Sequence, residues 1–126
     1  MKMSVVIKNL ENALRDLEQK CDLIGSALVT ARGQMMSSSL PQSTEEKAVS
    51  AMAASILSIG HRVGRELDAG APKSILIDGT DMSVIIRGHE NLILVGIAPV
   101  NCELALVDFE LGQALDRIRK ILEREI

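Results

Sequence analysis

Histidines and closely spaced aspartates are the side chains of this sequence that could act as bases or metal ligands. His61 and His89 are the two histidines, and neither belongs to an HExxH pattern. Asp78 and Asp81 flank a Gly-Thr pair and could contact calcium, but the segment lacks the remaining oxygen ligands of a calcium site, and a turn uses the same residue types. We therefore expect no metal site, with His61 at the polar edge of a helix contact and His89 solvated in a hairpin.

Two arginines that follow a long apolar run allow a catalytic interpretation. Arg62 or Arg65 could act as an arginine finger, a cation that stabilises the transition state of phosphoryl transfer. Both also lie in the last turns of a predicted helix, where a cation stabilises the helix dipole. We favour the second interpretation, which leaves the chain without catalytic residues of its own.

The two cysteines stand alone in the sequence. Cys21 and Cys102 have neither CxxC spacing nor a neighbouring histidine, so we expect reduced, largely buried thiols and no zinc or redox site. The N-terminal segment MKMSVVIK has a short apolar run before Lys8, far shorter than the core of a signal peptide. These features predict a cytoplasmic protein.

The sequence lacks the common motifs of nucleotide binding and hydrolysis. No GxxxxGK[ST] loop, GxGxxG turn or GxSxG elbow occurs. A net charge of −3 argues against nucleic-acid binding, which needs a basic patch. Phe109 is the one aromatic residue, so a stacking platform for bases is also excluded. We expect no cofactor, no nucleic-acid partner and no enzymatic activity.

The segment from Ala48 to Gly60 comes directly before His61, Arg62 and Arg65 and must position these side chains. It is unusual because it carries no charged residue. A helix that is apolar all round must be covered on more than one side. The run is shorter than a membrane span and contains several serines, so we expect it to pack against protein. A Ser-x-x-Glu capping box at residues 43–46 predicts the start of this helix, and a glycine and a proline predict its end within residues 68–72.

Helical spacing divides this predicted helix into two faces. We expect the bulky face to pack on the sheet of its own chain. It contains Val49, Met52, Ala53, Ile56, Ile59, Gly60, Val63 and Leu67. The opposite face consists mostly of small residues, which let a second backbone approach closely, so we expect that face to meet a partner.

The remaining segments alternate between helix-like and strand-like patterns. Helices are predicted at 5–20 and 103–126, where apolar residues recur every three or four positions. Strands are predicted at 23–31, 34–38, 74–78, 82–87 and 92–98, with a glycine turn between the first two. The last two runs are almost continuously apolar, which indicates strands covered on both faces. The sequence therefore predicts a single α/β domain over residues 1–126, with helices on both faces of a five-stranded antiparallel sheet.

Three segments carry a resemblance to a known family: Gly25–Val29, Ser37–Pro41 and, above all, Ala51–Gly60. Through them the chain resembles the roadblock/dynein light chain family, whose small domains are often described as regulators of Ras-like GTPases. The resemblance implies a three-layer α/β sandwich of profilin-like order α-β-β-α-β-β-β-α, with the central helix on one face of the sheet and the terminal helices on the other. It also implies a homodimer in which the central helices lie side by side and the third strands join two sheets into one.

We expect the dimer interface on the small-residue face of the central helix and on the third strand. Its residues would be Ser50, Ala51, Ala54, Leu57, Ser58, His61, Ile75, Leu76 and Ile77. The function that the resemblance implies is a non-enzymatic homodimeric module that binds and regulates a Ras-like small GTPase. One alternative is a structural scaffold or adaptor subunit of a larger complex. Another is a small-molecule sensor domain, which would need a sizeable apolar pocket with a few convergent polar groups.

Overall fold

The structure is a computed structural model that describes residues 3–124. Its elements follow the predicted order and lie within about three residues of the predicted bounds. They are α1 (Met3–Cys21), β1 (Gly25–Thr30), β2 (Met35–Ser39), α2 (Glu46–Glu66), β3 (Ser74–Asp78), β4 (Met82–His89), β5 (Leu92–Pro99) and α3 (Leu104–Arg124). The predicted end of the last helix at Ile126 lies outside the described residues.

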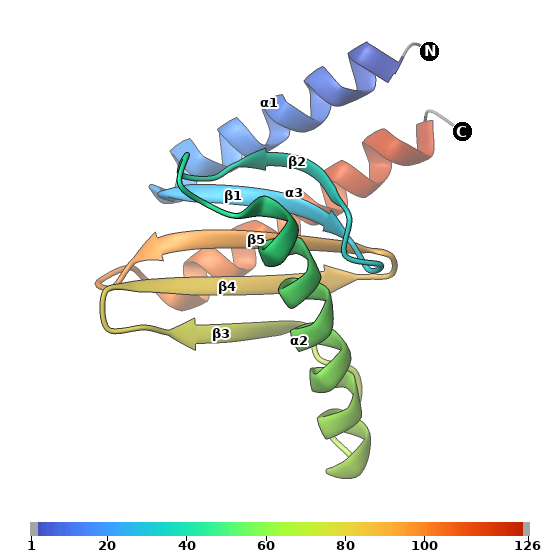
Figure 1. Cartoon of the computed structure of the whole chain (residues 1–126), viewed down its shortest axis with the longest axis vertical. Helices are drawn as coiled ribbons and strands as arrows, with labels where there is room; N and C mark the ends of the chain where they lie inside the picture. Colours follow the sequence, from blue (N-terminus) through green and yellow to red (C-terminus); the bar gives the residue numbers. More distant parts are fainter. Residues whose placement is uncertain (1–2, 125–126) are drawn as a thin grey trace.

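The five strands form one antiparallel sheet in the order β2-β1-β5-β4-β3 (Figure 1). The first hairpin turns at Gly33, whose φ of 87° lies in the left-handed region that glycine tolerates best. At the other side of the sheet, β3 pairs with β4 through the register Ile75 to Ile86, and no further strand of the described residues pairs with β3. The third strand is therefore an open edge of the sheet.

Helices cover both faces of the sheet and create two cores. In Figure 1, α1 and α3 lie together behind the sheet and α2 crosses its front. Neighbouring residues of β4 enter different cores, because Ile85 packs with α1 and α3 whereas Ile86 packs with α2. Both faces of the central strands are thus buried, which explains their nearly continuous apolar sequences and confirms the predicted three-layer arrangement.

The terminal helices present the apolar stripes that their spacing predicts. The buried residues of α1 and α3 are Val6, Leu10, Ala13, Leu14, Leu17, Val107, Leu111, Leu115 and Ile118. On the outer side of this layer, Arg117 pairs with Asp16 at 3.0 Å, so a charged contact joins the two helices at their exposed rim. An exposed pair of this kind contributes little to stability, and the apolar stripes hold this layer together.

The start of α2 differs from the predicted capping box. Glu45 is the N-cap residue and its side chain makes no capping hydrogen bond. The carboxylate of Glu46 instead accepts a hydrogen bond of 2.6 Å from the Ser38 hydroxyl on β2. The predicted cap is therefore wrong, because the glutamate that would complete the box ties the first turn of α2 to the sheet.

The end of α2 agrees with the predicted stop. The backbone takes positive φ values at Asp68 and Gly70, and the amide of Ala69 donates to the carbonyl of Gly64 at 2.8 Å. The returning chain passes so close to the helix that a Cβ at Gly64 would overlap the carbonyl oxygen of Gly70. This tight reversal lies beyond the sheet, because the second half of α2 runs past the edge strand β3 (Figure 1).

Candidate interaction surfaces of α2

The face of α2 that packs on the sheet is narrow and consists of small residues around one leucine. The buried residues of the helix are Ser50, Ala53, Leu57 and Gly64. Leu57 is 7% exposed and lies directly over Gly88 of β4, where a Cβ would overlap its side chain. Ser50 is 2% exposed, and its hydroxyl donates to the carbonyl of Lys47 at 3.0 Å. Small residues let the helix approach the strands closely, and Leu57 fills the space that Gly88 leaves.

The expectation that the bulky face of α2 holds the fold is correct for Ala53 and wrong for most of its larger residues. Ile59 is 56% exposed and Val63 is 50% exposed, and Met52 and Leu67 are exposed as well. The sheet already supplies large apolar side chains under the helix, among them Ile86 and Ile93. A close approach therefore favours small residues at the contact, and the larger side chains of α2 lie on its flank.

These larger side chains form a continuous stripe, which we call the apolar flank. It consists of Met52, Ile56, Ile59, Val63 and Leu67. Spacings of three and four residues place them along one side of the helix, as at the seam of a coiled coil. This spacing is typical of a helix–helix contact, but periodicity alone does not distinguish an exposed stripe from a stripe that packs in the core.

The apolar flank lies on the same side of α2 as the open edge of the sheet. A Cβ at Gly60 would lie 2.9 Å from Cδ1 of Ile75 on β3, so the helix touches the edge strand at this point. Leu76 and Ile77 of the same strand are exposed. An unpaired edge strand beside exposed apolar side chains is a typical association surface.

The opposite flank of α2 borders a groove with a different character, which we call the cationic groove. It has a volume of about 340 Å³ and runs between α2 and the turns that end the β1–β2 and β4–β5 hairpins. Its lining residues are Ala31, Ala54, Leu57, Ser58, His61, Arg62, Arg65, Glu90 and Ile93. Arg62 and Arg65 are exposed and form no ion pair with any residue between 3 and 124.

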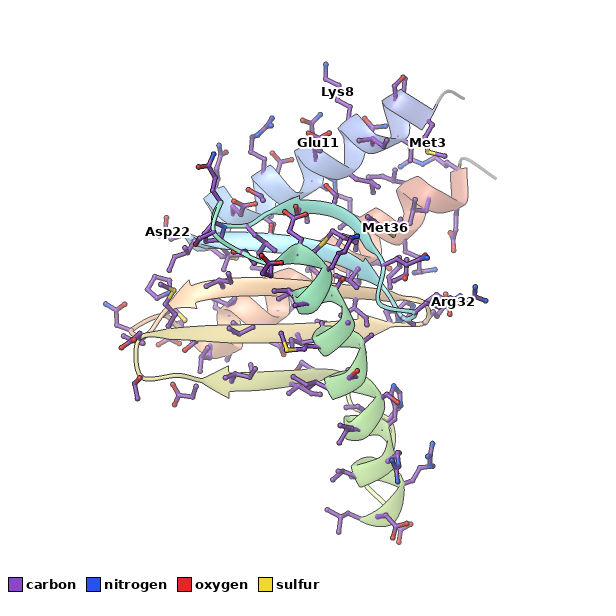
Figure 2. The ribbon with its side chains drawn as sticks, in the orientation of Figure 1. Met3, Lys8, Glu11, Asp22, Arg32 and Met36 are labelled. Atoms are coloured by element: carbon purple, nitrogen blue, oxygen red, sulfur yellow. The ribbon has the colours of Figure 1, made fainter. Side chains whose placement is uncertain are left out.

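Figure 2 shows side chains projecting from both sides of the part of α2 that extends past the sheet, with Arg32 projecting from the neighbouring hairpin turn. Because Arg62 and Arg65 are exposed, both can contact another molecule.

The structure separates the predicted interface residues into three groups. Ser50 and Leu57 are buried by the chain's own sheet, and the small part of Leu57 that remains exposed lines the cationic groove. Exposed or half-exposed positions on α2 are Ala51, Ala54, Ser58 and His61, of which the last three line the cationic groove. Ile75, Leu76 and Ile77 lie on the open edge strand.

The residues that could act as bases or metal ligands lie at the surface of the molecule. Asp78, Asp81 and His89 are exposed, and within residues 3–124 no group of three His, Cys, Asp or Glu side chains could hold a metal ion. Cys21 and Cys102 are half-exposed free thiols and are less buried than predicted. Burial raises the pKa of the Cys21 thiol, and the carboxylate of Glu110 adds to this effect.

None of the helices between residues 3 and 124 combines the length and apolarity that a membrane crossing requires. A family model described as the Roadblock/LC7 domain matches residues 9–98, which include α2, four complete strands and all but the last residue of β5. The chain belongs to the Roadblock/LC7 family. This membership confirms the resemblance found in the three sequence segments.

Individual relatives of this roadblock chain are distant. An uncharacterised protein of Methanocaldococcus jannaschii is 24% identical over 110 residues, which cover 87% of this chain and 96% of the relative. The solved structure of Myxococcus xanthus MglB is similar with a TM-score of 0.86 at 18% identity, covering 95% of this chain and 92% of MglB. At such identities the structural likeness shows the fold.

A profilin from Schizosaccharomyces pombe shares the same fold with a TM-score of 0.67 at 11% identity, covering 89% of this chain and 98% of the profilin. The predicted profilin-like order is therefore confirmed for this roadblock chain. The cationic groove and the apolar flank are built on the element of this fold, α2, that carried the most specific part of the resemblance.

Proposed function

We propose that this roadblock domain is a non-enzymatic homodimeric module that binds and regulates a Ras-like small GTPase. The observation that carries the proposal is the division of α2 into two exposed flanks of different chemistry beside an open edge strand. Family membership supports it, because roadblock domains are often described as regulators of such GTPases.

The apolar flank and the open edge strand suit a second copy of the chain. Burial of Ile59, Val63 and their neighbours would remove apolar side chains from water. Pairing of β3 with the β3 of a second chain would satisfy the free backbone groups of the edge. A two-fold axis brings the same patch of both chains together, so one surface of this kind is sufficient for a dimer.

The cationic groove suits the GTPase. Arg62 and Arg65 offer guanidinium groups that bind carboxylates strongly, and the apolar floor of the groove offers a contact for a loop of the partner. In this arrangement the regulator holds the switch loops of the GTPase, and the residues that catalyse hydrolysis belong to the GTPase itself.

The test is the rate of GTP hydrolysis by the cognate GTPase with and without this protein, together with a pull-down. We expect binding and a changed rate, and we expect the Arg62→Glu and Arg65→Glu double variant to lose both. The matched control is Lys8→Glu, which reverses an exposed charge on α1 at the other face of the sheet. The absence of binding and of any rate change with the wild-type protein would refute the proposal.

A second candidate is a structural scaffold subunit that tethers a larger complex. It is favoured by one observation, the exposure of Leu106 and Phe109 on the outer side of α3, away from α2. Co-purification from the native cell distinguishes the two functions. A stable complex that persists whichever nucleotide is bound supports the scaffold, whereas binding that depends on the nucleotide supports the regulator.

A further inference from the structure

A second charged cavity lies across the sheet from the cationic groove. It is an open pocket with a volume of about 280 Å³ between the segment before β3, the end of β4 and the middle of α3. Its lining residues are Lys73, Arg87, Gly88, His89, Gly112, Leu115 and Asp116. None of these residues takes part in the contacts proposed for α2, so the dimer and the GTPase give this pocket no role.

Arg87 is fixed at the wall of this cavity by one edge of its guanidinium group. Nη1 lies 3.0 Å from Oδ2 of Asp108 and also donates to the Asp108 carbonyl at 3.1 Å. The group lies flat against α3, because Gly112 has no side chain there: a Cβ would lie 2.8 Å from Cζ of Arg87. No acceptor among residues 3–124 engages Nε or Nη2. These two nitrogens form the other edge of the guanidinium, which remains available to donate a pair of hydrogen bonds.

Two cations, Lys73 and Arg87, and one carboxylate, Asp116, line the pocket, and Arg87 is also paired with Asp108 beside it. Lys73 is exposed and has no ion-pair partner among residues 3–124. His89 also lines the cavity, and its Nε2 lies 3.8 Å from the carboxylate of Glu90. Asp116 is the one carboxylate in the lining, and it already contacts Arg119 at 2.8 Å and Lys120 at 3.3 Å. The acidic group is thus occupied, whereas Lys73 and one edge of Arg87 are not.

We propose that this cavity binds a small oxyanion, a phosphate or carboxylate group. The free edge of Arg87 supplies a planar pair of donors that matches two oxygens of such a group. Lys73 supplies a second charge from the segment before β3, which lies beside β4, and His89 supplies a further donor. The proposal does not rest on the GTPase or on the dimer, because the cavity lies on the α3 side of the sheet.

The test is a titration of the ¹⁵N-labelled protein with inorganic phosphate and, in a second series, with acetate, each at constant ionic strength maintained with chloride. We expect saturable amide shifts at Lys73, Gly88, His89 and Gly112. Saturation with phosphate alone assigns the site to phosphoryl groups, and saturation with acetate alone assigns it to carboxylates. Either result supports the oxyanion site.

Two lysine variants test whether the anion binds in this pocket and not elsewhere on the surface. Lys73→Gln should weaken binding about tenfold, the usual effect of losing one hydrogen bond to a charged group. Lys47→Gln removes an exposed lysine from α2 and should leave the affinity unchanged. Since Lys73 is exposed, its variant should fold, and the test does not depend on Arg87, whose replacement could disturb the contact with Asp108. Equal affinities of the Lys73→Gln variant and the wild type, or no saturable shift with either anion, would overturn the proposal.

Discussion

At the scale of single residues, close backbone approaches explain why small side chains lie where large ones were expected. Gly88 leaves room for Leu57, and Gly33 lets the first hairpin lie against α2, where a Cβ would be 3.3 Å from the Cα of Ala51. Each contact joins residues far apart in the sequence. A substitution at such a point therefore tests tertiary packing and not helix propensity.

Leu57→Ala should lower the free energy of unfolding by about 2–5 kcal/mol, because a buried leucine is removed from a contact that cannot close over Gly88. Urea denaturation measures the change. Ser58→Ala, at the next and exposed position of the helix, is the control and should change stability by less than about 0.5 kcal/mol. A Leu57→Ala variant as stable as Ser58→Ala would show that this face of α2 does not pack on the sheet.

Cys21 should make stability depend on pH in the alkaline range. Its pKa is raised in the folded chain, chiefly by burial, so folding favours the protonated thiol. The stabilising contribution is complete below the ordinary thiol pKa, and it is lost as the pH rises from that value through the raised pKa of the folded state. Denaturation of the wild type and of Cys21→Ala between pH 7 and pH 10 should therefore give curves that converge or cross as the pH rises. Curves that stay parallel would contradict the assignment.

At the scale of elements, α2 has three sides that differ in their chemistry and in what they contact. One side packs on the sheet, one is the apolar flank and one borders the cationic groove. The apolar flank follows the spacing of a helix–helix seam and lies beside the edge strand. The two exposed flanks can therefore be tested separately with the same substitution at neighbouring positions.

Ile59→Arg should dissociate the proposed dimer, because it places a charge in the apolar seam. Ser58→Arg should leave the dimer intact, because Ser58 lines the groove on the other side of the helix. Sedimentation velocity over a range of concentrations distinguishes monomer from dimer, and circular dichroism checks that both variants remain helical. If Ser58→Arg dissociates the dimer and Ile59→Arg does not, the second copy contacts the opposite flank.

At the scale of the whole molecule, the two edges of the sheet differ in character. The β2 edge carries serines that donate to glutamates of the adjoining helices, since Ser39 donates to Glu18 at 3.1 Å and Ser38 donates to Glu46 at 2.6 Å. The β3 edge carries Ile75, Leu76 and Ile77, and no helix within residues 3–124 covers its outer side along its length (Figure 1). Association of two chains is therefore expected at β3 and not at β2.

The thermal midpoint of the wild type should rise with protein concentration, because association of folded chains shifts the equilibrium away from the unfolded state. Differential scanning calorimetry over a hundredfold range of concentration measures the shift. The Ile59→Arg variant supplies the comparison and should unfold at a midpoint independent of concentration. A wild-type midpoint that is equally constant would argue that the chain does not associate through its folded state.

Most of the fold could be predicted because its helices, strands and turns depend on residues that are close together in the sequence. The stripes of α1 and α3, the turn at Gly33 and the continuous apolar runs of β4 and β5 each follow from periodicity or from the preference of one residue type. The cap of α2 could not be predicted, because Glu46 bonds to Ser38, a partner supplied by another element. The cavity around Arg87 was missed for the same reason, since its walls come from three separate segments.

The sequence by itself determined that the segment from Ala48 to Gly60 is a helix without charged residues, and it predicts from this that more than one side of the helix is covered. Only the tertiary structure decided which side faces the sheet. Periodicity places Leu57 and Ile59 on different sides of the helix, but it carries no information about the surface opposite. That surface contains Gly88 and large apolar strand residues, so Ser50, Ala53 and Leu57 face inward and most of the apolar flank remains exposed.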